Sequence, residues 1–93
     1  MASRRDLKKD INYLATEILS QGYMKLALME TVKEEDLQPI MAEAIEMRNE
    51  YVSRANHPNG RHNKKVTKDY FQALRKGLME KAVELLNKIQ ALN

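Results

Sequence analysis

One corner of the sequence decides the fold: His57-Pro58-Asn59-Gly60-Arg61-His62-Asn63-Lys64-Lys65. A residue that precedes proline is pushed out of the α region, so His57-Pro58 ends any helix before it. Asn59-Gly60 is a strong turn dipeptide. On both sides of this corner, apolar residues recur at steps of three and four, which predicts amphipathic helices. The sequence therefore predicts an all-α protein in which the corner joins two long helices.

Three helices are expected, over approximately residues 4–31, 37–56 and 65–92. Short connections between long helices favour antiparallel neighbours, so the expected fold is an up-down-up three-helix bundle that packs as a homodimer. A chain of 93 residues fits a single domain, residues 1–93. The expected core is one row of apolar residues from each helix. It comprises Leu7, Ile11, Leu14, Ile18, Ile40, Ala44, Ile45, Val52, Leu74, Leu78, Leu85 and Ile89.

Four residues bear on the helix boundaries. We expect Asp36 to cap the second helix. The third helix should start between Asn63 and Thr67, and Thr67 is the better cap, because Asp and Thr both favour the N-cap position. Pro39 would then lie in the first turn of the second helix, where its missing N–H costs nothing. Gly22 interrupts the first helix, and we interpret it as a tolerated glycine or a close helix contact, with a break there as the alternative.

Composition excludes several classes of protein. Hydrophobic residues are 43% and charged residues 31% of the chain, which is typical of a globular domain. The chain has no Cys, which excludes disulfides and thiolate metal sites. No apolar run approaches the length of a membrane span, and the N-terminus lacks the apolar region of a signal peptide. We therefore expect a cytoplasmic protein that does not interact with membranes.

Charge is divided unevenly along the chain. Residues 1–53 carry 7 Lys or Arg against 10 Asp or Glu, whereas residues 54–93 carry 9 against 3. In an up-down-up bundle, the start of the first helix lies at the same end as the corner, and the two together form a basic pole. This pole could bind an anion such as nucleic-acid phosphate. Its candidate anion contacts are Arg4, Arg5, Arg61, Lys64 and Lys65.

The alternative interpretation of the basic pole is solvated surface, which is what most charge runs are. No aromatic residue lies within the corner, so stacked bases would find no platform there. Nucleic acid is therefore the less favoured partner.

No motif predicts catalysis or metal binding. His57 and His62 are five residues apart without a carboxylate between them, which is not a standard spacing of metal ligands. Glu43, Glu46 and Glu50 are spaced by three and four residues, but a di-iron site in a helical bundle also needs Glu-x-x-His motifs, which are absent. We expect these glutamates to face water. The sequence predicts no catalytic, cofactor-binding or metal-binding residue, and no enzyme.

The stretch 23–29 is apolar nearly all the way round the first helix. A bundle helix normally keeps one polar face, and exposed apolar surface usually marks an interface. The stretch therefore predicts a self-association patch made by Tyr23, Leu26, Met29 and Leu86. The alternative is a core end that is fully covered within one chain. The most favoured function is a non-enzymatic helical interaction or structural protein that self-associates, and the alternative is an anion-binding module.

The opening Ser3-Arg4-Arg5-Asp6-Leu7-Lys8-Lys9-Asp10-Ile11-Asn12-Tyr13-Leu14 resembles the start of a family of small, uncharacterised bacterial proteins. The similarity extends through Ala44-Ile45-Glu46-Met47-Arg48-Asn49-Glu50, the Asn56-His57-Pro58 corner and the closing Ala91-Leu92-Asn93. The resemblance implies an all-helical fold without an assigned activity, and it transfers no site residues.

Overall fold

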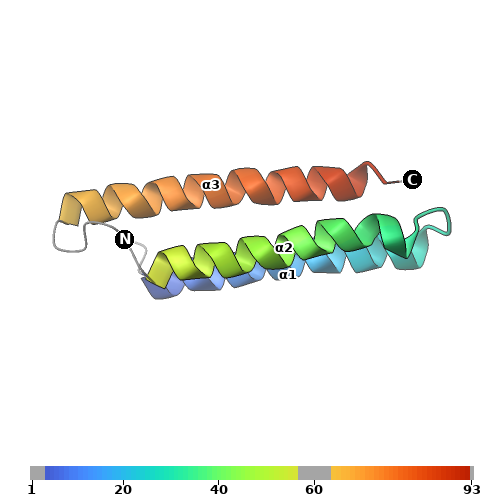
Figure 1. Cartoon of the computed structure of the whole chain (residues 1–93), viewed down its shortest axis with the longest axis horizontal. Coiled ribbons are helices and arrows are strands. Elements are labelled where there is room, and N and C mark those ends of the chain that lie inside the picture. Colours follow the sequence, from blue (N-terminus) through green and yellow to red (C-terminus); the bar gives the residue numbers. More distant parts are fainter. Residues whose placement is uncertain (1–3, 57–63, 93) are drawn as a thin grey trace.

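The computed structural model describes residues 4–56 and 64–92, which form three helices. These are α1 (Arg4–Leu28), α2 (Glu34–Asn56) and α3 (Lys64–Gln90). They run up, down and up along one axis (Figure 1). The all-α, three-helix prediction is confirmed. The corner that suggested it, residues 57–63, lies outside the described residues.

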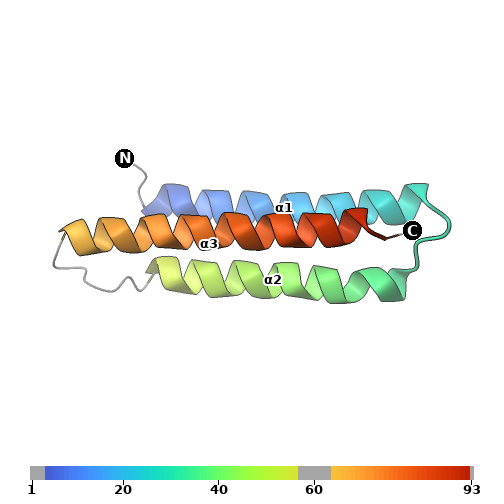
Figure 2. The same ribbon diagram turned by 90° about the horizontal axis from the view of Figure 1, so that it is seen from above.

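The bundle is a rod of 52 × 19 × 18 Å. Its radius of gyration is 15.3 Å, whereas a compact domain of this length has about 12 Å. The molecule is elongated because its three helices, of 23 to 27 residues, lie side by side along the same axis (Figure 2). Such a rod has long surface grooves between its helices and little depth for an enclosed cavity.

Polar contacts fix the register of the helices. Asp10 bonds Arg75 at 2.7 Å, and the Lys25 ammonium donates to the Gln90 carbonyl at 2.7 Å. Both contacts join residues 65 positions apart, so α1 and α3 are parallel with a constant offset. With an offset of 65 residues, Arg4 lies level with Asp69, so the first turn of α3, which begins at Lys64, extends beyond the start of α1. Figure 1 shows this turn extending past both other helices.

Two helix C-termini are capped by side chains from a neighbouring helix. The last four carbonyls of a helix have no partner within it. The Tyr70 hydroxyl donates to the Arg54 carbonyl in the last turn of α2 at 3.0 Å. Lys25 serves the last turn of α3 in the same way through Gln90, and its positive charge also suits the negative end of the helix dipole. These contacts tie α3 to α2 at one end and to α1 at the other.

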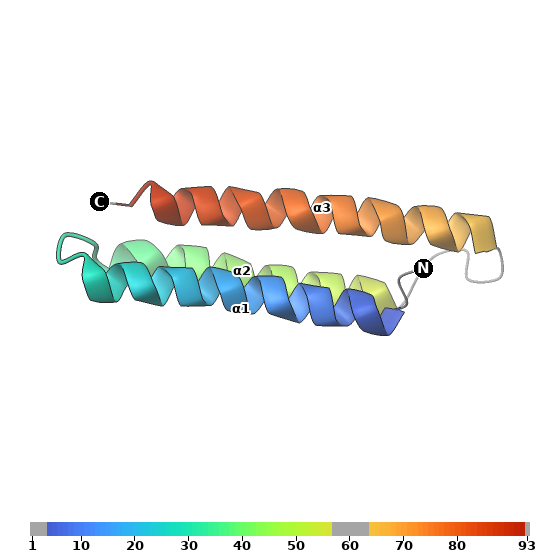
Figure 3. The ribbon, with the colours of Figure 1, turned by 180° about the vertical axis from the view of Figure 1, so that it is seen from behind.

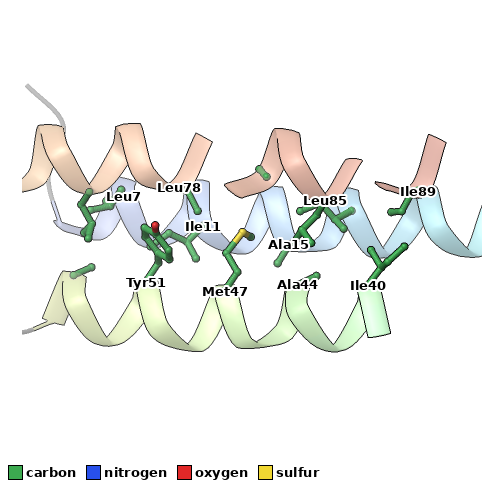
Figure 4. Close-up of a cluster of buried hydrophobic side chains, with 14 of the residues drawn as sticks. Leu7, Ile11, Ala15, Ile40, Ala44, Met47, Tyr51, Leu78, Leu85 and Ile89 are labelled. Carbon is green, nitrogen blue, oxygen red and sulfur yellow. The ribbon is translucent and has the colours of Figure 1, made fainter. Parts of the chain in front are cut away.

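One hydrophobic core runs the length of the rod (Figure 4). Its middle contains one buried alanine from each helix, namely Ala15, Ala44 and Ala82. The helix registers place the three at about the same level, so the backbones can approach closely there. Leucine and isoleucine fill the core on either side. The buried members of the core cluster are Leu7, Ile11, Ala15, Ile18, Leu37, Ile40, Ala44, Met47, Tyr51, Ala55, Leu74, Leu78, Ala82, Leu85 and Ile89.

The expected core is largely confirmed, with one error on α2. Ile45 is 48% exposed, so its assignment to the core is wrong. The buried stripe of α2 passes through Ala44 and Met47, and a residue next to Ala44 points about 100° away from it. Leu14 and Val52 are partly buried and pack against the core from its edge.

The start of α2 also differs from the prediction. The Lys33 carbonyl accepts hydrogen bonds from the N–H groups of Asp36 and Leu37, so α2 begins at Glu34 and Asp36 is not its cap. Pro39 consequently lies in the second turn, where its missing N–H would have bonded the Glu35 carbonyl. The expected placement of Pro39 in the first turn is wrong.

Two further boundary predictions have clear outcomes. α3 begins at Lys64, which is within the expected range of residues 63–67, but Thr67 lies inside the helix and does not cap it. Helix α1 continues through Gly22, so there is no break. A Cβ at Gly22 would lie 3.1 Å from Leu37 Cδ1 and 3.4 Å from Met41 Cε. The interpretation of Gly22 as a close helix contact is confirmed.

Candidate functional site

The structure describes only some of the residues of the predicted basic pole. α1 and α3 begin at the same end of the rod, at Arg4 and Lys64 (Figure 2). Arg5 and Lys65 are exposed there. Arg61 lies outside the described residues. The fold thus supplies the topology that the basic pole requires.

The predicted self-association residues differ in their exposure. Tyr23 is 62% exposed and Met29 is 36% exposed, whereas Leu26 and Leu86 are partly buried against the core.

Two of the exposed hydrophobic side chains, Tyr13 and Met79, lie at the seam between α1 and α3. At one point, a cavity of about 200 Å³ lies between the two helices, where Tyr13 and Met79 flank the Asp10–Arg75 ion pair. Because residues three or four apart lie on the same side of a helix, and α1 and α3 are parallel, Met24 and Leu28 on α1 and Val83 on α3 lie on the same side of the molecule as this cavity. We call this side the α1/α3 face, and its exposed apolar residues are Tyr13, Met24, Leu28, Met79 and Val83.

A second surface feature lies between α2 and α3, and we call it the α2/α3 groove. Its volume is about 540 Å³. One wall carries carboxylates from α2, and the opposite wall carries Lys81 from α3. The floor is apolar, since Met47 and Tyr51 are buried. The groove is lined by Glu43, Glu46, Met47, Glu50, Tyr51 and Lys81.

One ion pair, Lys88–Glu43, crosses the groove at one end, and two more lie beside it on α3. The Lys88 ammonium lies 3.1 Å from Glu43 and 3.6 Å from Glu84, and Glu84 also lies 3.5 Å from Lys81. The hydrogen bond with Glu43 raises the pKa of Lys88 above its usual 10.5, and the charge of Glu84 adds to this rise. At the other end, Arg54 pairs with Glu50 at 2.9 Å and lies 5.3 Å from the centre of the Tyr51 ring.

The Tyr51 hydroxyl occupies a slot that Gly77 leaves open. A Cβ at Gly77 would lie 2.8 Å from the Tyr51 oxygen, closer than real contacts allow. The glycine therefore lets the tyrosine side chain reach from α2 across to the backbone of α3 (Figure 4 shows the ring and its oxygen). This pair could not be predicted from the sequence, because it depends on the register of α2 relative to α3.

Within residues 4–56 and 64–92, no three His, Asp or Glu side chains converge so that they could hold a metal ion. Both histidines lie outside those ranges, so the argument from their spacing is not tested. Over the same residues, no helix combines the length and apolar composition needed to cross a membrane.

Comparisons with known proteins add no identification. No protein-family model matches the chain, and neither a curated protein nor a solved structure matches it. The resemblance of the opening sequence to small bacterial proteins stays a prediction.

Proposed function

We propose that this protein is a non-enzymatic helical interaction protein that forms a homodimer through the α1/α3 face. The supporting observation is that five large, exposed hydrophobic side chains share one side of a small bundle. Exposed apolar side chains that share one side of a small protein commonly mark an interface. The proposal keeps the self-association expected from the sequence and moves its centre from Tyr23 to the seam between α1 and α3.

A two-fold arrangement suits this face. In a symmetric dimer, the same patch packs against its own copy, so residues on α1 of one chain meet their equivalents or those on α3 of the other. Two nearly straight helices form the face, and apolar side chains recur on them at helical spacing. Met24 and Leu28 follow each other by four residues on α1, as Met79 and Val83 do on α3. Packing along the rod would therefore bury all four side chains together.

Sedimentation equilibrium at micromolar concentration tests the homodimer. We expect a mass near twice that of one chain for the unmodified protein. Val83→Glu should give a monomer, because it places a charge in the proposed interface. Ile45→Glu is the matched control, since Ile45 is 48% exposed and Val83 is 50% exposed, but Ile45 lies on α2. A monomeric unmodified protein, or equal effects of the two variants, would reject the proposal.

Anion binding at the basic pole is the second candidate function. Its support is the topology, which brings the starts of α1 and α3 to one end of the rod. Arg5 and Lys65 are exposed there. Phosphate contacts by Lys and Arg release counterions from nucleic acid, so such binding weakens steeply with added salt.

Filter binding of nucleic acid at two salt concentrations tests this candidate. Lys64→Glu combined with Lys65→Glu should abolish binding, and added salt should weaken binding to the unmodified protein. The control combines Lys33→Glu with Lys76→Glu, which changes net charge equally away from the pole. Binding that is absent at low salt, or that both double variants weaken alike, would count against a specific anion site.

A further inference from the structure

Charge is divided between the two ends of the rod. Residues 4–10 and 64–69, where α1 and α3 begin, carry seven Lys or Arg against three Asp or Glu. The connection between α1 and α2 lies at the other end together with the first turn of α2. There, residues 29–36 carry four Asp or Glu against one Lys. One end of the rod is therefore basic and the other is acidic.

The α1/α3 face lies between these two ends. Each α3 residue lies level with the α1 residue whose number is 65 lower, so Met79 lies level with position 14 of α1 and Val83 with position 18. The exposed apolar residues of the face therefore extend from Tyr13 to Leu28. This row is about 22 Å long, since each residue of a helix rises about 1.5 Å.

A two-fold dimer through this face can be parallel or antiparallel. In a parallel dimer, the two basic ends lie side by side, and so do the two acidic ends. In an antiparallel dimer, the start of α1 in each copy lies beside the acidic connection of the other. Like charges placed across an interface cost free energy, whereas opposite charges orient and accelerate association. The charge distribution of the rod thus favours the antiparallel dimer.

We propose that a second copy binds the α1/α3 face in the antiparallel orientation, with the two-fold axis at the middle of the apolar row. This inference rests on the proposed homodimer and gives the partner its direction. In this register, Tyr13 of one copy lies level with Leu28 of the other. Val83 lies within one residue of the level of Met24 of the second copy. The apolar rows of the two copies therefore overlap along their full length.

The same register brings opposite charges together at two places. Glu17, one turn after Tyr13, lies within one residue of the level of Lys25 of the second copy. Nearer the basic end, the exposed Lys9 reaches the level of the second copy's connection, where Glu30 is exposed. A parallel dimer would instead place Glu17 beside Glu17 and Lys9 beside Lys9.

Spin labels test the orientation directly, because the chain has no Cys and one can be introduced at each chosen position. Gln72→Cys puts a label at an exposed position level with Leu7, near the basic end. In the antiparallel dimer, its two labels should lie about 40 Å apart along the axis, whereas a parallel dimer keeps them level. Asn87→Cys is the control. It is exposed and level with Gly22, close to the two-fold axis, so its labels should be close in either orientation.

The orientation and the homodimer can fail separately in this experiment. A long separation for Gln72→Cys together with a short one for Asn87→Cys would support the antiparallel dimer. Short separations at both positions would overturn the antiparallel orientation and leave the homodimer standing. If neither variant gives a separation between copies, and sedimentation gives the mass of one chain, the homodimer itself is rejected.

Exchanging the charges of the two ends provides an independent test. Arg5→Glu with Lys9→Glu places acidic residues beside the acidic connection, and should weaken association about threefold or more at low salt. Adding Glu30→Lys and Glu34→Lys restores opposite charges across the antiparallel interface, so the affinity should return to within about twofold. Added salt should reduce both effects, and circular dichroism verifies that each variant remains helical. Failure of the four-residue variant to recover would overturn the antiparallel orientation.

Discussion

Gly77 and Tyr51 can be understood only as a pair. Glycine inside a helix costs about 1 kcal/mol relative to alanine. A Cβ at Gly77 would lie 2.8 Å from the Tyr51 oxygen, but 3.7 Å from the nearest ring carbons, which is ordinary contact. The hydroxyl alone therefore excludes a larger residue at position 77.

This pair predicts a change of sign in a double-mutant cycle. Gly77→Ala should destabilise the unmodified protein, because the buried Tyr51 ring must move away from the new methyl group. In the Tyr51→Phe background, the same substitution should stabilise by up to about 1 kcal/mol, which is the gain in helix propensity. Urea unfolding of the four proteins measures both effects. Destabilisation of equal size in both backgrounds would show that the hydroxyl is not the obstacle.

Met47 and Ile45 make a second contrast between single residues. Met47 is 2% exposed, whereas Ile45 is 48% exposed. Met47→Ala should cost about 2–5 kcal/mol in the free energy of unfolding, as large-to-small changes in a core do. Ile45→Ala should cost about 0.5 kcal/mol or less, as surface substitutions usually do. Similar losses for the two variants in urea unfolding would be inconsistent with the orientation of α2.

At the scale of the element, α2 contains one position where its backbone hydrogen bonding is interrupted. Pro39 lies inside the helix, and the Glu35 carbonyl opposite it lacks an N–H donor. Pro39→Ala should therefore stabilise the protein by about 1–2 kcal/mol, because the recovered hydrogen bond and the relieved ring contact outweigh the gain in unfolded-chain entropy. Thermal or urea unfolding measures the change, with Gln38→Ala as the neighbouring control. Loss of stability in Pro39→Ala would refute this prediction.

The ion pairs between α2 and α3 depend on pH through Lys88. Its pKa is raised by the hydrogen bond with Glu43, so the folded state binds this proton more tightly than the unfolded state. The stabilisation is complete below the unfolded pKa and is lost as the pH rises through the higher folded pKa, at strongly alkaline pH. NMR titration of the Lys88 side chain should give a higher midpoint than in Glu43→Gln. An unchanged midpoint would show that Glu43 does not hold the proton.

Helix number and the central positions of the core could be predicted from spacing alone, because periodicity records which face of each helix is buried. Residues at the edge of a stripe, such as Ile45, could not be assigned, since one position shifts a side chain by about 100°. The start of α2 was missed because backbone bonds to Lys33, and not a capping side chain, define it. The α2/α3 groove depends on which residues of α2 face which residues of α3. This register could not be predicted from the spacing of apolar residues in one sequence.

On the scale of the whole molecule, the rod separates its chemistry by side and by end. The α1/α3 face carries exposed apolar side chains beside the Asp10–Arg75 ion pair, the α2/α3 groove carries three glutamates, and α1 and α3 begin with basic residues at one end. A slender bundle has three seams between its helices, so distinct surfaces can be used without interfering with one another.

If the α1/α3 face forms a homodimer, stability should depend on protein concentration. Association stabilises the folded state by mass action, so the melting temperature should rise as concentration increases. Val83→Glu should remove that dependence. Calorimetry over a hundredfold range of concentration provides the measurement. A melting temperature that stays constant for the unmodified protein would argue against the dimer.

The odd number of helices places Arg4 and Leu92 at opposite ends of the rod (Figure 3). A peptide joining the two ends would have to run along a molecule 52 Å in length, which takes about 15 residues even when fully extended. A circularly permuted variant with a short linker should therefore not fold into this bundle. Conversely, groups attached at its two termini are held apart, so the same rod can serve as a rigid spacer.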